Sequence, residues 1–186
     1  YANIQSAAFY TNVADTRTDG VELTGNYQLD LQQWGRLNLS SGYSQNNTRI
    51  TALRDVGNIA GSQIVGRTTQ GLIEDGTPKN KLTLSANWLY DSWGLTLAQR
   101  RYGQWKSLNA SNPTLDQTFS AQWVTDLDIS YSFDMSLKLS VGAINLFDTH
   151  PDKASGAQLY GVPKYSITSP EGAQGAFYYT SLSYDF

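Results

Sequence analysis

Few residues in this chain have the chemistry of a catalytic or metal site. The only histidine, His150, stands between Asp148 and Asp152 in "DTHPD", and no second histidine or other ligand cluster supports it. The chain has no cysteine, which excludes disulfides, thiol chemistry and cysteine-bound metals. We therefore expect solvated side chains in this segment, with no metal site and no cofactor.

Asp126 and Asp128 stand two residues apart, a spacing that places both carboxylates on one face of a strand. Such a pair could perform acid–base chemistry. The simpler interpretation is that both carboxylates are solvated in the interior of a barrel near its tight-turn end. The stretch "GTPKNK" lacks the glycine spacing and the following helix of a phosphate loop. Because no catalytic constellation is visible, we predict that the protein is not an enzyme.

Arginines and aromatic residues in or beside the irregular segments suggest a binding function instead. A cation cluster in an open vestibule would raise the local concentration of an anionic ligand, and aromatic rings would offer stacking surfaces. The alternative is that these are ordinary loop charges, partly balanced by Asp55, Glu74 and Asp75. The candidate ligand-binding residues are Arg49, Arg54, Arg67, Arg100, Arg101, Trp105, Tyr160 and Tyr165.

The segments that must position these side chains show the two-residue period of β-strands and almost no helical periodicity. Tight turns are expected at 29–34, 90–93 and 133–136. Long irregular segments are expected at 51–78, 106–120 and 148–173, with a shorter loop at 13–18. If every strand reverses direction, all tight turns lie at one end and all long loops at the other. About eight strands are predicted, at 19–29, 36–43, 81–90, 93–98, 125–133, 136–144 and 175–186, with a weaker one within 1–12.

Several features of these strands favour a membrane over a soluble fold. The aromatic residues gather where the apolar rows end, as in the two girdles of a membrane barrel. Strands of 9–12 residues match a tilted membrane crossing, and a sheet in lipid must close. The formal net charge of −3 provides no broad basic surface for nucleic acid. The charges within the strand cores all fall on the polar rows: Glu22, Arg36, Asp126, Asp128, Lys138 and Asp185.

The predicted fold is therefore all-β, an antiparallel up-and-down transmembrane β-barrel. A soluble barrel remains an alternative, with its apolar row facing an inner ligand and its polar row facing water. A third possibility is a self-contained eight-stranded membrane barrel that serves as an adhesin or envelope anchor, because eight strands can close. The small polar residues of the inner rows fit a wide or plugged interior better than a filled one.

Four stretches together resemble the C-terminal part of a TonB-dependent outer-membrane receptor of the siderophore-receptor type. They are "TRTDGVELTGNYQL", "TPKNKLTLSANWLY", "LKLSVGAINLFDTHPDK" and "SLSYDF", and they cover nearly the whole chain in the family's order. One departure concerns the segment before the last strand, where the family often has Gly-x-x-Gly-Arg. In "EGAQGAFYY" Ala176 stands where that arginine would fall.

The resemblance implies that residues 1–186 are the C-terminal portion of a 22-stranded barrel, whose plug domain and earlier strands are not in this chain. It implies a bacterial outer-membrane protein in contact with lipid, with long loops extracellular and tight turns periplasmic. The parent receptor would take up a scarce small molecule, such as a ferric siderophore, haem, cobalamin or a glycan. Its energy would come from TonB, which contacts the missing N-terminal part.

The end of the chain also resembles the C-terminal strand of bacterial outer-membrane proteins, which the barrel-assembly machinery reads. Apolar residues alternate with polar ones up to a terminal phenylalanine. The simpler interpretation is that this phenylalanine fills an interface position, and the two are compatible. The candidate assembly-signal residues are Tyr178, Leu182, Tyr184 and Phe186.

Overall fold

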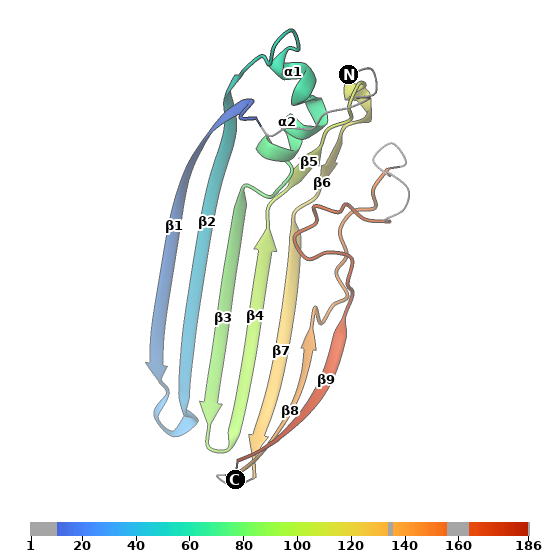
Figure 1. The fold of residues 1–186 in the computed structure, drawn as a ribbon. Coiled ribbons are helices and arrows are strands. Elements are labelled where there is room, and N and C mark those ends of the chain that lie inside the picture. Colours follow the sequence, from blue (N-terminus) through green and yellow to red (C-terminus); the bar gives the residue numbers. More distant parts are fainter. Residues whose placement is uncertain (1–10, 134–135, 156–163, 186) are drawn as a thin grey trace.

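The structure of the chain is a computed structural model, which describes residues 11–133, 136–155 and 164–185. Seven strands form one antiparallel sheet in the order β1-β2-β3-β4-β7-β8-β9 (Figure 1). Within the described residues, no helix has the length and apolar composition to cross a membrane. The strands of the sheet are β1 (Ala14–Asp30), β2 (Arg36–Leu53), β3 (Asn80–Tyr90), β4 (Trp93–Tyr102), β7 (Gln122–Ser132), β8 (Leu137–Ile144) and β9 (Phe177–Tyr184).

The tight turns lie together at the lower end of the sheet in Figure 1, and the long connections lie at the upper end. The first turn contains a short 3₁₀ helix (Gln32–Trp34), and Gly35 follows it with a φ of 84°, a conformation that favours glycine. Two residues join β3 to β4, the first of which is Asp91 with a φ of 50°. The predicted segregation of turns from loops is therefore confirmed.

Several segments differ from the sequence-based expectation. The predicted loop at 13–18 is wrong, because β1 already begins at Ala14, opposite Leu53 on an equally extended β2. The segment 51–78 is not irregular throughout, because it contains the end of β2 and two short helices, α1 (Gly61–Ile64) and α2 (Arg67–Glu74). The segment 106–120 also contains the second half of a hairpin. That hairpin consists of β5 (Trp105–Ser107) and β6 (Gln117–Phe119), and it is a separate two-stranded sheet. The weak strand expected within 1–12 lies almost wholly outside the described residues.

The cross-strand register sorts the side chains of the sheet onto two faces. One face is apolar. A row of cross-strand partners on this face runs over four adjacent strands: Leu37, Trp88, Leu95 and Ile129. Many of the large apolar residues on this face are exposed, including Leu23, Leu97, Val141 and Leu182. An exposed apolar face of this extent is typical of a surface that meets lipid.

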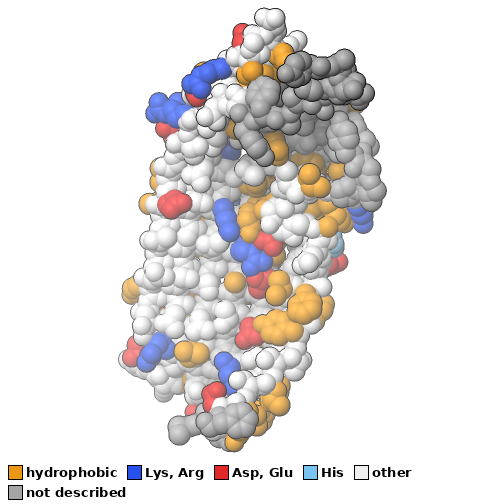
Figure 2. Space-filling model, viewed as in Figure 1, with side chains coloured by type: hydrophobic (Ala, Val, Ile, Leu, Met, Phe, Trp, Pro, Cys, Tyr) orange, Lys and Arg blue, Asp and Glu red, His pale blue; other side chains and the backbone are white. Residues whose placement is uncertain are grey.

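The opposite face is polar (Figure 2), and charged side chains of both signs gather near its middle. Five of its side chains form a row across the sheet, which we name the transverse polar row: Asn38, Asn87, Thr96, Asp128 and Tyr179. Asn87 Nδ2 donates to Thr96 Oγ1 at 2.8 Å, and Tyr179 Oη donates to Asp128 Oδ2 at 2.8 Å. Asn38 Nδ2 lies 3.5 Å from Asn87 Oδ1.

Aromatic rings mark the turn end of the apolar face, as the girdle interpretation predicts. Trp93 contacts Tyr131 edge-on, with ring centroids 4.8 Å apart, and Tyr131 contacts Phe133 at 5.0 Å. Trp88 stacks on Tyr90 at 5.6 Å and donates its indole N–H to the Trp34 carbonyl. Rings with one polar atom suit such an interface because they satisfy both apolar and aqueous surroundings.

The sheet is open at both edges within the described residues. β1 and β9 are its end strands, and they do not pair with each other. An edge strand leaves a row of backbone N–H and C=O groups without partners, which is unfavourable in lipid. The fold is therefore a curved part of a larger barrel wall, all-β and antiparallel.

Candidate functional site at the loop end of the sheet

The candidate arginines do not form one vestibule of unpaired cations. Arg54 pairs with Asp15, and Arg49 lies 3.6 Å from the Asp19 carboxylate, both at the upper end of β1 and β2. Arg67 pairs with Asp116. Each of these cations therefore has a neighbouring carboxylate, which reduces its attraction for a diffusing anion.

The neighbours Arg100 and Arg101 lie on opposite faces of the sheet, because they are adjacent in β4. Arg100 lies on the polar face, where it pairs with Asp126, and its Nε donates to Glu171 Oε1 at 3.1 Å. Arg101 lies on the apolar face, opposite Leu82 and Trp123. A ligand in the interior of the barrel could reach only the first of the two.

Arg100 ties the last long connection to the barrel wall. Glu171 belongs to the segment that leads into β9, so its contacts with Arg100 bring that segment against β4 and β7. Asp126 makes a second link, because its Oδ1 accepts the Asn145 backbone N–H at 2.9 Å. Asp126 and Asp128 therefore serve as hydrogen-bond acceptors of the wall, and they do not face each other as an isolated acid–base pair.

The aromatic candidates have different environments. Trp105 is 2% exposed and stacks on Phe119, with ring centroids 5.1 Å apart, so its ring is covered by the β5–β6 hairpin. Tyr165 stacks on His150 at 5.3 Å, and the Lys164 ammonium lies 5.1 Å from the Tyr165 ring centroid. Tyr160 lies outside the described residues.

A cavity of about 210 Å³ lies between α2, the β5–β6 hairpin and the segment 165–168. Its wall is mostly apolar, and Tyr165 is the only one of the sequence candidates within the described residues that lines it. Lys106 and Thr168 place polar groups at the same wall. Such an arrangement can hold the apolar or aromatic part of a small molecule and orient its polar part. The apolar and aromatic lining residues are Leu72, Leu108, Ala110, Phe119, Ala154, Tyr165 and Ile167.

The helix α2 forms one side of this cavity because it packs closely on the strand connection. A side chain at Gly71 would meet Leu108, since a Cβ there would lie 2.5 Å from Leu108 Cγ. The Glu74 carboxylate accepts the Ile50 backbone N–H at 2.7 Å, which ties the end of α2 to β2. The helix is short, so these contacts rather than intrinsic propensity hold it in place.

An ion pair between Arg67 and Asp116 ties α2 to the loop after β5. Arg67 donates to both Asp116 carboxylate oxygens, at 2.6 and 2.5 Å, and also to the Asn109 carbonyl at 2.6 Å. The hydrogen bonds from Arg67, together with that from the Asn109 backbone N–H, lower the pKa of Asp116 to about 2 against the opposing effect of desolvation. The hydrogen bonds to Asp116 in turn raise the pKa of Arg67, against the opposing effect of desolvation. The pair therefore holds α2 to the loop after β5 across the ordinary pH range.

His150 contacts its own loop. Its Nδ1 lies 2.8 Å from the Asp148 carbonyl, and no group of three or more histidine, aspartate or glutamate side chains within the described ranges could hold a metal ion. Asp152 accepts the Ser120 backbone N–H at 2.6 Å. These residues therefore hold the loops together.

The assembly-signal candidates lie on the exposed apolar face of β9. Tyr178, Leu182 and Tyr184 are each more than half exposed (66%, 68% and 56%). Phe186 lies outside the described residues. This exposure is compatible with contact to lipid, and the reading of the strand by assembly machinery stays a prediction.

Sequence reasoning missed most of the cavity wall. Leu72, Leu108 and Phe119 stand in segments without strong periodicity, so no pattern marked them as neighbours. Glu171 was missed too, since its partner Arg100 lies far away in the sequence. For Arg100 and Arg101 the signal was present, because continuing the two-residue alternation past Ala98 assigns them to opposite faces.

Comparison with solved structures places this fold among outer-membrane receptors and transporters. The pyoverdine receptor FpvA of Pseudomonas aeruginosa matches with a TM-score of 0.59 and 17% identity, over 92% of this chain and 22% of that chain. A mutant of the ferric enterobactin receptor PfeA of the same organism matches with a TM-score of 0.55 and 20% identity, over 89% of this chain and 22% of that chain. The copper transporter OprC matches with a TM-score of 0.57 and 16% identity, over 93% of this chain and 24% of that chain.

The chain thus spans less than a quarter of the length of these structures, and at these identities the likeness concerns the fold. No curated protein sequence matches the chain significantly. The profile of the TonB-dependent receptor-like β-barrel family matches residues 1–146. That match covers most of the chain and agrees with the open antiparallel sheet, its polar inner face and its apolar outer face, so the chain belongs to the TonB-dependent receptor-like β-barrel family.

Proposed function

We propose that this chain is the C-terminal portion of a TonB-dependent outer-membrane receptor that takes up a ferric siderophore. In this proposal the apolar face meets the lipid of the outer membrane and the polar face lines the interior. The long loops are extracellular and the tight turns are periplasmic. TonB acts through a part of the receptor that lies outside this chain.

The observation that carries the proposal is the loop-end cavity beside a polar barrel wall. The cavity combines an apolar wall, including Leu72 and Ile167, with the Tyr165 ring and the ammonium-bearing side chain of Lys106. Catecholate complexes of iron present both apolar ring surface and negative charge, and these groups complement such a wall. Two of the solved structures with this fold are named for pyoverdine and ferric enterobactin, which supports the same class of ligand.

The proposal is tested by uptake through the complete receptor. Cells that express the full receptor as their single route for ferric siderophores would be supplied with radioactive iron complexed by catecholates, hydroxamates or pyoverdine-type peptides. We expect one class to be accumulated, and we expect accumulation to stop when TonB is deleted. Copper uptake is measured in parallel, since one solved structure of this fold is a copper transporter.

The outcomes separate the parts of the proposal. Accumulation of copper without any ferric complex would overturn the siderophore assignment and keep the receptor. Uptake that persists without TonB would overturn energy coupling. A native polypeptide of only 20.5 kDa that ends in "SLSYDF" would overturn the receptor itself and favour a self-contained barrel that serves as an adhesin or anchor.

A further inference from the structure

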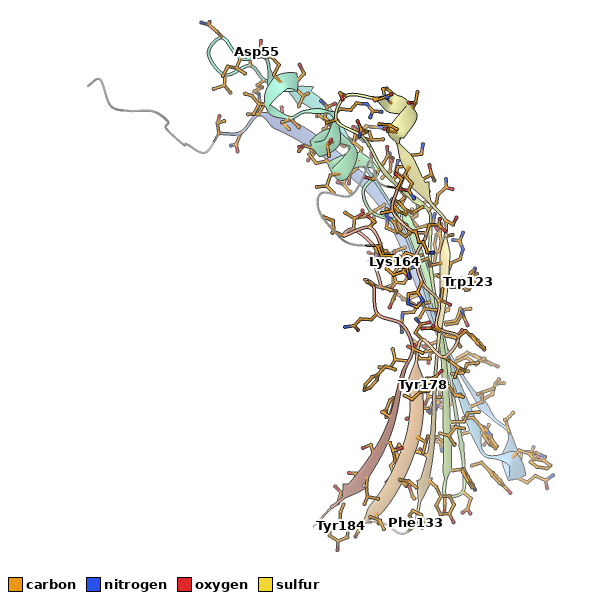
Figure 3. The ribbon with its side chains drawn as sticks, turned by 90° about the vertical axis from the view of Figure 1, so that its right-hand side faces the viewer. Asp55, Trp123, Phe133, Lys164, Tyr178 and Tyr184 are labelled. Atoms are coloured by element: carbon orange, nitrogen blue, oxygen red, sulfur yellow. The ribbon has the colours of Figure 1, made fainter. Side chains whose placement is uncertain are left out.

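Arg101 is a cation on the lipid-facing side of the sheet. Its cross-strand partners are Leu82 on β3 and Trp123 on β7, and both belong to the apolar face. In Figure 3 Trp123 lies on one side of the sheet, and Lys164, in the segment that crosses the polar face, lies on the other. A cation in this position cannot contact a ligand inside the barrel.

The neighbours of Arg101 hold the guanidinium in one orientation and leave its charge unbalanced. Its Nη1 donates to Asn80 Oδ1 at 2.7 Å, and the centre of the guanidinium lies 5.9 Å from the Trp123 ring centroid. A guanidinium has five N–H donors, and the bond to Asn80 uses one. Arg101 forms no ion pair within residues 11–133, 136–155 and 164–185.

The outward-facing Arg17 shows the contrast. It pairs with Asp19 at 3.0 Å, near the upper end of β1, so it has a carboxylate partner, although Arg49 also lies 3.6 Å from that carboxylate. Arg101 has an aromatic ring and an amide in place of a carboxylate. Its surroundings therefore favour an external anion as the partner.

The height of Arg101 on the wall matches the edge of a bilayer. Trp93 belongs to the aromatic cluster at the turn end, and nine residues of β4 run from Trp93 to Arg101, which is close to the roughly 9–11 residues that a tilted strand needs to cross a bilayer. The outward apolar band of a membrane barrel is about 25 Å tall, flanked by aromatic girdles. Below Arg101 on the same row, Gln99 Oε1 accepts the Thr125 hydroxyl at 2.8 Å, where the apolar surface gives way to polar groups.

We propose that Arg101 and Trp123 form a binding site for a phosphate group of an outer-leaflet glycolipid. The planar guanidinium can donate two parallel hydrogen bonds to phosphate oxygens. The Trp123 ring and the neighbouring apolar row contact the acyl chains of the same lipid. The site uses the orientation of the proposed receptor, in which the loop end is extracellular, but it does not depend on which ligand the receptor transports.

The test compares lipids bound to the full receptor in detergent by native mass spectrometry. The probes are bisphosphorylated lipid A, its phosphate-free analogue and phosphatidylglycerol. We expect the wild-type receptor to retain bisphosphorylated lipid A in preference to both others. We expect Arg101→Gln to lower its apparent affinity by about tenfold, the loss of one charge-assisted contact. Arg101→Lys keeps the charge but not the two parallel donors, so its affinity for lipid A should lie between those of the wild-type receptor and Arg101→Gln.

The matched control is Arg17→Gln, which removes an outward arginine that already has a carboxylate partner and should leave lipid A binding unchanged. Folding of each variant is checked by its mobility in unboiled gels, where folded barrels migrate differently. Equal retention of phosphorylated and phosphate-free lipid A by the wild-type receptor would overturn the proposal without any variant. So would a preference for phosphatidylglycerol, or equal losses in Arg101→Gln and Arg17→Gln.

Discussion

Tyr179 on β9 reaches across β8 to Asp128 on β7, and its hydroxyl donates to Asp128 Oδ2 at 2.8 Å. The residue between them on β8 is Gly142, which pairs with both. A Cβ at Gly142 would lie 2.8 Å from Tyr179 Cε1. The ring therefore lies over the glycine, and the absence of a side chain there allows the contact between non-adjacent strands.

Gly142→Ala should destabilise the sheet by about 1–3 kcal/mol, because the added methyl group must displace the Tyr179 ring from Asp128. The midpoint of thermal unfolding of the full receptor in detergent measures the effect. The control is Gly66→Ala, where a Cβ would meet nothing within 4 Å and the φ is −66°. Equal midpoints for the two variants would contradict the packing account.

Arg100→Met should release the segment that leads into β9, because Asp126 and Glu171 would then face each other without the cation. We expect faster hydrogen exchange over 164–176 and a loss of about 1–3 kcal/mol in stability. Arg36→Met, at an exposed position at the turn end of the polar face, serves as the control. If exchange over 164–176 is unchanged in Arg100→Met, the ion pairs do not hold this segment.

The contact between α2 and the loop after β5 should weaken in acid. Asp116 has a usual pKa of 3.8, and in the fold its pKa is lowered to about 2 by Arg67. A lowered pKa stabilises the fold above pH 3.8, and that stabilisation is lost as the pH falls from about 4 to about 2. Hydrogen exchange of peptides from 105–119, corrected for its intrinsic pH dependence, should therefore accelerate in this window.

Asp116→Asn provides the check on that assignment, since an amide does not titrate. Its exchange over 105–119 should be fast already at pH 6 and should show no further acceleration between pH 4 and pH 2. A variant that keeps the wild-type acceleration would place the titrating group elsewhere.

Filling the loop-end cavity should block the ligand. Ala110 lines the cavity and is exposed, so Ala110→Trp adds volume there without disturbing a packed core. We expect the uptake of the accepted ferric complex at limiting concentration to fall by at least about tenfold. Ser62→Trp adds the same ring to an exposed position of α1 outside the cavity, and its uptake should match the wild type. Equal uptake by both variants would remove the cavity from the binding site.

The strands and their faces were predictable because apolar and polar residues alternate along each strand of this sheet. The positions of Asp126 and Asp128 on the polar face follow from their alternation with Leu127 and Ile129. The helices were not predictable, since α2 has only eight residues, too few for a helical pattern to stand out, and depends on contacts such as that of Gly71 with Leu108. The burial of Trp105 beneath Phe119 depends on a three-residue hairpin, which is too short to leave a pattern.

The transverse polar row has a consequence for how the barrel keeps its alignment. If one strand slid past its neighbour by two residues, every polar side chain would remain inside and every apolar one outside, so alternation alone does not forbid the error. Such a slide would separate Asn87 from Thr96, or Asp128 from Tyr179. The hydrogen bond between the two side chains would then be lost. The transverse polar row therefore fixes the register of the strands and resists the sliding of one strand along its neighbour.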